Sequence, residues 1–322
     1  MLLSFNIKLY LVLGLTFLFG FIAATTISLV YSHGGNTNSI HGCVDNKGNL
    51  RIVGANENCK NKETPLDWKS ASVFSTHPVC PYCDLSSADL TDQSLDRPYL
   101  VYAILNGQNL SGKTMTNGDM SKAQMTNVNL TGSNLTNTKI TEVDLTSSNL
   151  SSANLTNIDG GLANLTNVNF NNANLSNANL GTSNLSGATF IGANLNGIEL
   201  SYTNITAAQI LSASILTGIK LGSMNLSGIN FSGRDLTGGY FASTAVFDNA
   251  DFSGANLTGA DLQDSSFQNV NFNGANFTNA VLHRATNVGT SNVTGTVWSN
   301  TICPDGTNSD DHGNTCAGHL VY

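Results

Sequence analysis

The sequence has little charge. Only 11% of its 322 residues are charged, and the formal net charge is −8. Lysine and arginine gather nowhere into a basic patch, which argues against a surface built to bind nucleic acid. A chain with so few charges folds only if its apolar residues, 40% of the total, recur regularly enough to form a continuous core.

The sequence also lacks a recognisable catalytic motif. Its six histidines are scattered, and none lies in a motif that supplies both a nucleophile and a base. They are His33, His41, His77, His283, His312 and His319. The paired carboxylates Asp261 and Asp264 fall at outward positions of a repeat, where solvated side chains are expected. We therefore predict a protein that is not an enzyme and holds no cofactor or metal.

What the sequence does contain is an apolar residue at every fifth position. Of the 27 multiples of five from 85 to 215, only Gly160 is not a large apolar residue. A small or β-branched residue usually stands two positions earlier, with a polar residue between them. The clearest copies are residues 173–177 (Ala-Asn-Leu-Ser-Asn) and 255–259 (Ala-Asn-Leu-Thr-Gly).

A period of five fits neither a helix, with 3.6 residues per turn, nor a long strand, with a period of two. It fits a chain that turns a corner every five residues. The small residue and the leucine are two apart, so both point inward on a short extended side. The fifth residue of each unit makes the bend. Four sides close a coil of about 20 residues, and stacked coils form an all-β solenoid.

The Ala-Asn/Asp-Leu-x-x unit resembles the pentapeptide-repeat family, over about two thirds of the chain. The resemblance implies a right-handed quadrilateral β-helix across residues 78–300. It says little about function, because the same scaffold carries many activities. Some members of the family mimic DNA and bind topoisomerases.

The repeat has irregularities at four places. Gly160 leaves one inward position without a side chain, which is either a local packing change or a binding notch. One extra residue shifts the phase after Ile215, after Phe241 and after Leu282. We interpret these insertions as bulges that preserve the stack.

Phenylalanines recur one coil apart in the later part of the repeat. Phe247 and Phe267 are 20 residues apart, as are Phe252 and Phe272. We expect the rings of each pair to stack face on face inside the rod, as packing rather than as a cofactor site.

The N-terminal segment, residues 1–32, contains an uncharged run at residues 9–31 preceded by Lys8. Its 23 residues are long enough to cross a bilayer as a helix. We favour an uncleaved membrane anchor, with a cleaved signal peptide ending near Ser32 as the main alternative and a buried soluble helix as a third. Both leading interpretations predict an exported body, either membrane-anchored or secreted.

Residues 33–77 form a linker and a small module. A disulfide between Cys43 and Cys59 would stabilise a hairpin that is too small to be stable alone. The pattern resembles a module near the N-terminus of exported bacterial repeat proteins. We expect this module to cap the first coil or to space it from the membrane.

Cys80 and Cys83 form a Cys-x-x-Cys motif near His77. Together they could hold zinc or exchange thiols. Both cysteines also fall on inward positions of the first coil, which favours core residues or a local disulfide.

The tail, residues 301–322, abandons the period and resembles the C-terminal ends of other exported pentapeptide-repeat proteins. Cys303 and Cys316 are expected to pair and to close a cap over the last coil. The loop between them offers oxygen ligands that suit Ca²⁺, although a solvated loop is favoured. These ligands are Asp305, Asn308, Asp310 and Asp311.

These features predict a non-enzymatic, exported or membrane-anchored scaffold that binds a surface protein or a glycan. A DNA-mimicking protein that binds topoisomerase is the alternative, but residues 84–302 carry only 14 acidic against 7 basic residues. A carbohydrate- or ice-binding surface is a further alternative. The many Asn-x-Ser/Thr triplets arise from the repeat itself and indicate glycosylation only weakly.

Overall fold

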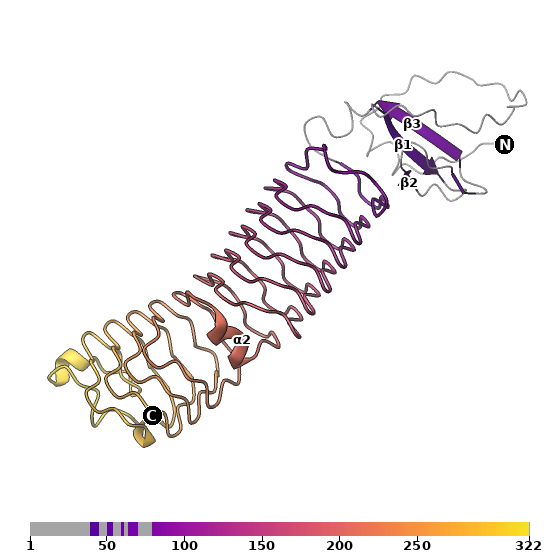
Figure 1. Cartoon of the computed structure of the whole chain (residues 1–322). Helices are drawn as coiled ribbons and strands as arrows, with labels where there is room; N and C mark the ends of the chain where they lie inside the picture. Colours follow the sequence, from indigo (N-terminus) through magenta and orange to yellow (C-terminus); the bar gives the residue numbers. More distant parts are fainter. Residues whose placement is uncertain (1–38, 45–49, 54–58, 61–63, 70–78, 322) are drawn as a thin grey trace, which may run out of the picture.

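The computed structural model describes residues 39–44, 50–53, 59–60, 64–69 and 79–321 (Figure 1). The apolar run at residues 9–31 lies outside these ranges, so the predicted N-terminal helix stays a prediction. Within the described ranges, no helix has the length and apolar character needed to span a bilayer.

The N-terminal module is a small antiparallel sheet. Its strands are β1 (Ser39–Val44), β2 (Leu50–Val53) and β3 (Thr64–Lys69), in the order β2-β1-β3. Cys43 on β1 is buried and joined by a disulfide to Cys59. Residues 70–78, which lead to the repeat, are outside the described ranges. A role for this module in capping the first coil therefore stays a prediction.

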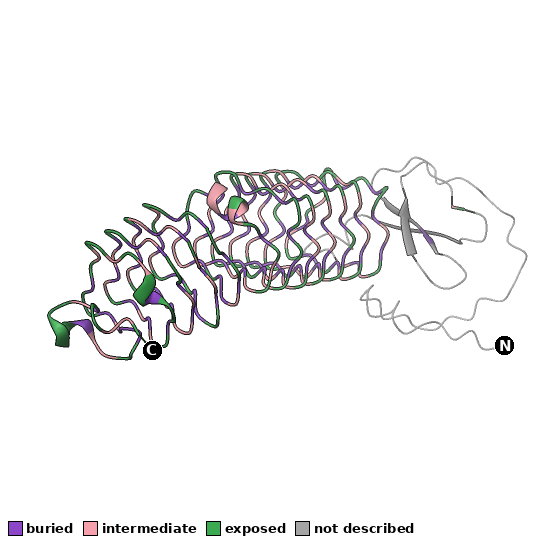
Figure 2. Ribbon diagram, turned by 90° about the horizontal axis from the view of Figure 1, so that it is seen from below, coloured by how far each residue is buried: buried purple, intermediate pink, exposed green. Residues whose placement is uncertain are grey.

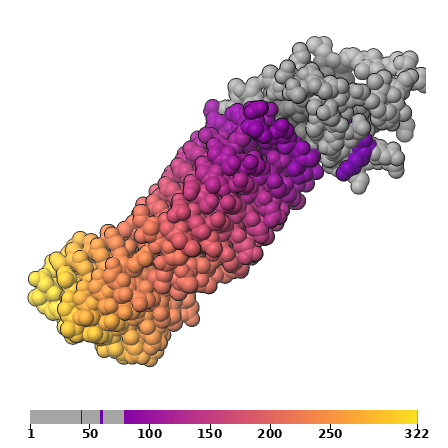
Figure 3. Space-filling view, viewed as in Figure 1, coloured from indigo at the N-terminus to yellow at the C-terminus, as the bar shows by residue number. Residues whose placement is uncertain are grey.

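Residues 79–302 wind into a four-sided β-helix, the long rod of Figures 1 and 3. Each side bridges in parallel to the residues 20 or 21 positions later. Leu175 donates its backbone N–H to the carbonyl of Asn194 at 2.9 Å, and Asn174 donates to the carbonyl of Ala153 at 2.9 Å. Each coil is thus hydrogen-bonded to the coils above and below, which confirms the predicted solenoid.

The inward rows form one continuous core along the rod. Leu175 and Ala173 are 0% and 1% exposed, whereas Asn174 between them faces solvent in part. Figure 2 shows buried and exposed segments alternating along each coil. Hydroxyls at small inward positions donate to backbone carbonyls, of the same coil for Ser133 (to Leu130 O at 2.7 Å) and of the preceding coil for Ser148 (to Met125 O at 2.7 Å). These buried hydroxyls are hydrogen-bonded, so they avoid the free-energy penalty of an unsatisfied buried polar group.

Corners are β-turns at the fifth residue of each unit, as the pattern predicts, and the structure shows that this residue is usually left-handed. In one corner, Ala173 donates its N–H to the carbonyl of Phe170 at 2.9 Å, and Asn172 has φ 58°. Asn177 repeats this geometry one side later, with φ 56°. Asparagine and glycine tolerate this conformation best, which explains their frequency at the fifth position.

The first phase shift lies earlier than predicted. Ile215 was expected inward but is 41% exposed, and Leu216 takes the inward place at 2%. The extra residue is absorbed before it, where the helix α2 (Ala207–Ser212) replaces one side of a coil. Thr206 caps α2 and Gln209 completes a capping box, so local helix chemistry overrides the five-residue period here.

The other two shifts lie where the sequence predicts them. Ser243 and Thr244, between Phe241 and Phe247, both adopt left-handed φ of 67° and add one residue to a corner. The third extra residue is taken up by the 3-10 turn η1 (Val288–Thr290). In each case the parallel bridges resume 21 residues apart.

Aromatic packing in the later coils follows the expectation in part. The rings of Phe247 and Phe267 stack, with centroids 5.5 Å apart and planes inclined by 7°. Phe252 and Phe272 are instead tilted by 31° at the same centroid distance, because each also meets other rings of the core. Trp298 ends the stack, 4.8 Å from the ring of Phe277 and at 5° to it.

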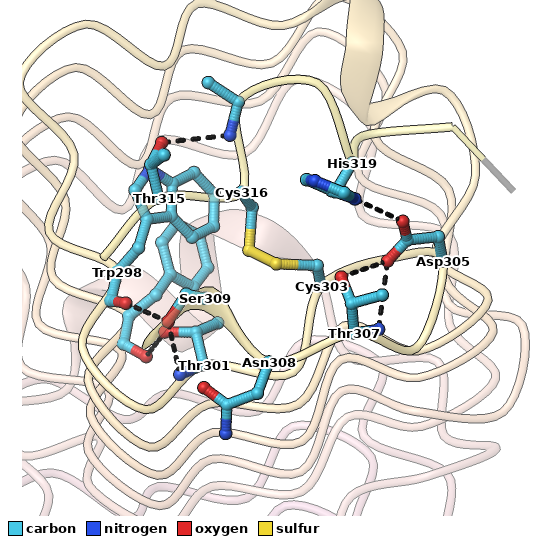
Figure 4. Close-up of a disulfide and its surroundings, with 12 residues drawn as sticks. Trp298, Thr301, Cys303, Asp305, Thr307, Asn308, Ser309, Thr315, Cys316 and His319 are labelled. Carbon is cyan, nitrogen blue, oxygen red and sulfur yellow. Dashed lines mark hydrogen bonds and ion pairs between the residues drawn. A yellow bond between two sulfur atoms is a disulfide. The ribbon is translucent and has the colours of Figure 1, made fainter. Parts of the chain in front are cut away.

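Residues 303–321 fold back on the last coil (Figure 4). Ile302 bridges Asn308 in antiparallel fashion, and Ser309 begins the 3-10 turn η2 (Ser309–His312). Ser309 is fully buried, accepts the N–H of Thr301 at 3.0 Å and donates to the carbonyl of Trp298. These contacts occupy backbone groups that the last coil would otherwise leave unpaired.

Candidate functional site

One side of the rod differs from the other three, and we call it the charged face. It has two outward rows. The strand row contains Val79, Tyr99, Asp119, Lys139, Asp159, Asn179, Glu199, Lys220, Tyr240, Asp261, Val281 and Ile302, joined by an unbroken series of parallel bridges. The corner row contains Tyr82, Tyr102, Lys122, Glu142, Leu162, Thr182, Tyr202 and Ser223.

The charged face collects the ionic side chains of the central rod. Between residues 98 and 233 the sequence has nine charged residues, and seven of them lie on this face. Lys113 and Asp144 are the two exceptions. Charges of both signs occur along the face, so it does not present the continuous negative charge of a DNA mimic.

The same face also collects exposed apolar and aromatic side chains. Six of the ten exposed large hydrophobic residues of the described chain belong to its two rows. They are Tyr82, Tyr99, Tyr102, Leu162, Tyr202 and Tyr240. Aromatic side chains among ionic ones are typical of protein-binding surfaces.

Two of the other sides carry ladders of amide and hydroxyl side chains that are hydrogen-bonded to one another. Thr166 donates its hydroxyl to Asn164 Oδ1 at 2.7 Å, and Asn184 Nδ2 donates to Thr166 Oγ1 at 3.0 Å. The same pattern links Asn174 to Thr156 at 3.0 Å. These bonds use donors and acceptors that a glycan or an ordered water layer would need.

Along the corner row the side chains contact one another. Tyr82 and Tyr102 stack with ring centroids 4.8 Å apart. Lys122 Nζ lies 5.4 Å from the Tyr102 ring centroid and 3.4 Å from Glu142 Oε1. The neighbouring Tyr102 side chain and the charge of Glu142 raise the pKa of Lys122.

A hollow of about 420 Å³ interrupts the charged face. It is lined by Gly161 and Gly181 and by Leu162 and Tyr202, whose side chains are 61% and 69% exposed. Its lining also includes Thr141, Asn179, Thr182, Glu199 and Ser201. The hollow is open to solvent and reaches no buried ionisable group.

The hollow is not the notch considered at Gly160. A Cβ at Gly160 would lie 2.9 Å from Leu180 Cδ2 and 3.2 Å from Ile140 Cγ1. Neighbouring side chains therefore fill the inward space. By contrast, a Cβ at Gly161 would meet nothing closer than 3.7 Å, and one at Gly181 nothing closer than 3.4 Å. Glycine at these two outward positions leaves room for a ligand.

The structure pairs all six cysteines: Cys43 with Cys59, Cys80 with Cys83, and Cys303 with Cys316. Cys80 and Cys83 are both buried in the first coil. His77, the third member of the alternative zinc or redox site, lies outside the described residues.

Three of the four candidate oxygen ligands of the tail, Asp305, Asn308 and Asp310, are hydrogen-bonded to neighbouring protein groups. Asn308 Oδ1 accepts the N–H of Asp310, whose carboxylate accepts the N–H of Asn300. In the described chain, no three His, Cys, Asp or Glu side chains converge as metal ligands do.

Asp305 has its own partners (Figure 4). It accepts hydrogen bonds from Thr307 and contacts His319 Nδ1 at 2.6 Å. Burial alone would raise the pKa of Asp305, but the bonds from Thr307 and the pairing with His319 outweigh it and lower the pKa to about 2.

The family model for pentapeptide repeats matches this chain in eight copies, over residues 99–132, 119–157, 163–201 and 245–285. The chain belongs to the pentapeptide-repeat family. Members of this family form right-handed β-helices, in agreement with the predicted handedness. No curated protein matches the chain.

Solved structures of other pentapeptide-repeat proteins are similar. HetL, involved in heterocyst differentiation regulation in the cyanobacterium Nostoc, is 25% identical over 71% of this chain and 88% of its own, with a TM-score of 0.41. A thylakoid lumen protein from Arabidopsis thaliana is 34% identical over 30% of this chain and 67% of its own, with a TM-score of 0.29. QnrB1, a plasmid-mediated fluoroquinolone resistance protein, is 21% identical over 61% of this chain and 91% of its own, with a TM-score of 0.37.

The five-residue period does not predict the charged face. That period separates inward from outward positions but does not distinguish the four sides. Writing the chain in coils of 20 residues places Tyr102, Lys122, Glu142, Leu162 and Tyr202 in one column. The sequence therefore carries this signal at a period of 20 residues, four times the length of the repeat unit.

Proposed function

We propose that this pentapeptide-repeat protein is an exported or membrane-anchored rod that binds a protein partner through its charged face. The observation that carries the proposal is the gathering of ionic and exposed aromatic side chains on one side of four. Pentapeptide-repeat proteins are generally structural or interaction proteins, and the rod offers an extended surface rather than a catalytic pocket.

A protein is the favoured partner because of the side chains present. Tyrosine is enriched among the residues that dominate binding energy at interfaces, and charges of both signs fix register and orientation. Tyr202 and Leu162 are the most exposed large apolar side chains of the face. The self-satisfied ladders of two other sides favour glycan or ice binding less.

Export is supported by two features of the sequence and structure. Three disulfides suit an oxidising compartment. The uncharged run at residues 9–31 has the length of a membrane-spanning helix. Fractionation of cells that express the chain with and without residues 1–32 tests this part: both forms in the cytoplasm would contradict export.

The binding proposal is tested by photocrosslinking in the cells that make the protein. A photoreactive amino acid replaces Tyr202 or Tyr102 on the charged face, or Asn134 or Asn174 on another side, as matched controls. We expect discrete cross-linked protein products from the first two positions only. Equal products from all four positions, or none from the charged face, would contradict the proposal.

A further inference from the structure

We propose that the partner of the charged face is a second copy of this chain, packed antiparallel with charged face against charged face. The inference rests on the proposed function, because it names the occupant of the same surface. It follows from the order of side chains along the two rows. When a row faces the same row of a second copy running in the opposite direction, the opposing side chains are complementary.

We call the positions that one coil contributes to the two rows a rung. The symmetry element is a two-fold axis that lies in the plane of the charged face, perpendicular to the rod. It passes midway between the rungs of Asp159 and Asn179. Such an axis reverses the rod direction but keeps each row opposite itself, so the strand row faces the strand row. Rungs at equal distances from the axis then oppose each other. Every contact occurs twice, as in any isologous dimer.

In this register, opposite charges of the two strand rows face each other. Lys139 opposes Glu199 of the second copy, and Asp119 opposes Lys220 of the second copy. Within the described chain, none of these four side chains makes an ion pair within 4.0 Å. One rung farther out, Tyr99 opposes Tyr240 of the second copy. Two symmetric sets give four ion pairs and two aromatic contacts.

The shape of the corner row fits the same register. Leu162 is 61% exposed, and the next rung carries Gly181 and Thr182, which both line the hollow. The two-fold axis places Leu162 opposite Thr182 of the second copy. Each Leu162 therefore enters the hollow of the other copy, and glycine at position 181 leaves the space for it.

Neighbouring registers are repulsive. With the axis on the rung of Asn179, Asp159 would oppose Glu199, and Lys139 would oppose Lys220. With the axis on the rung of Asp159, Asp119 would oppose Glu199. Like charges at an interface disfavour these arrangements, so the sequence selects one register against its neighbours.

The first test uses the full chain in mild detergent and a zero-length carbodiimide, which joins an amine to a carboxylate as an amide with loss of water. We expect cross-links from Lys139 to Glu199 and from Lys220 to Asp119. Within one chain Lys139 and Glu199 are three rungs, about 14 Å, apart. A direct amide between them therefore has to come from two copies.

The second test mixes two differently tagged populations of the full chain and measures co-capture. K139E and E199K each place like charges across the interface twice, and each alone should weaken self-association at least about 10-fold. A mixture of K139E with E199K restores opposite charges at both places. We expect co-capture of that mixture to recover to the level of the parent chain.

The hollow is tested by Gly181→Leu, which fills it, and by Leu162→Ala, which removes the inserted side chain. Both should reduce co-capture about 10-fold while the circular dichroism stays unchanged. Ile191→Ala is the matched control, because Ile191 is 62% exposed but lies on another side. It should leave co-capture at the parent level.

The pairing is overturned if the parent chain shows no co-capture up to about 100 µM, or if co-capture persists without the Lys139–Glu199 cross-link and ignores K139E. After either result the proposed function is still supported if the photoreactive residue at position 202 cross-links to a protein other than this chain. Failure of that crosslinking as well would remove the proposed function too.

Discussion

Replacing Leu175 by aspartate should unfold the centre of the rod. Leu175 is 0% exposed and packs in a row of inward leucines. The substitution forfeits the burial of a leucine side chain, about 2 to 3 kcal/mol. The new carboxyl must also be kept neutral, and a pKa shift of about 3 units adds about 4 kcal/mol at neutral pH. The total, about 6 to 7 kcal/mol, is comparable to the stability of a typical domain.

Denaturant unfolding followed by circular dichroism measures this loss. The matched control is Asn174→Asp, one residue away, whose side chain faces outward and should change the free energy of unfolding by less than about 1 kcal/mol. The loss in Leu175→Asp should shrink as the pH falls, since a buried carboxyl is tolerated only when protonated. If both variants lost similar stability, or Leu175→Asp lost almost none, the inward and outward assignments would be wrong.

Three further predictions concern the tail. Peptide mapping without reduction should find Cys303 linked to Cys316, and a link from either to another cysteine would contradict this fold. Asp305 has a lowered pKa, about 2 against 3.8 for an ordinary aspartate, so its stabilising contribution is complete above about pH 4 and is lost as pH falls toward 2. Urea unfolding of Asp305→Asn should therefore lack the part of the pH dependence that the parent chain shows in this window. Deleting the chain after Trp298 uncovers the last coil and should give larger, end-to-end species by light scattering; a stable truncated protein with unchanged solution size would show that the tail is no cap.

The fold followed from the sequence because one rule acts at every corner. An apolar residue and a small residue two apart must both point inward, and the bend between units accepts asparagine or glycine. This rule located Leu175 and Asn177 correctly without any long-range information.

The rule failed at Ile215 because the five-residue period cannot predict a segment that does not follow it, such as the helix α2. The four residues Thr206-Ala207-Ala208-Gln209 form a capping box, a local helix signal that was readable in the sequence. Counting in fives carried the phase through that helix and placed Ile215 one residue out of register.

The charged face needed three-dimensional information of another kind. Its members are 20 or 21 residues apart, so Lys139 and Glu199 come together on one side only after the coil length is known. The hollow depends further on which glycines are outward. Gly160 and Gly161 are adjacent in sequence, but one faces the filled core and the other faces solvent.

The helix α2 has a consequence for how the rod unfolds. Around it the parallel bridges of three sides are interrupted, while those of the charged face continue from Asn179 through Glu199 and Lys220 to Tyr240. In a linear array, cooperativity passes only through contacts between neighbouring units. The leucine-rich coils before α2 and the phenylalanine-rich coils after it are therefore weakly coupled folding units. Under heat or tension the chain should open at this junction first, leaving two shorter stacks that lose structure at separate midpoints.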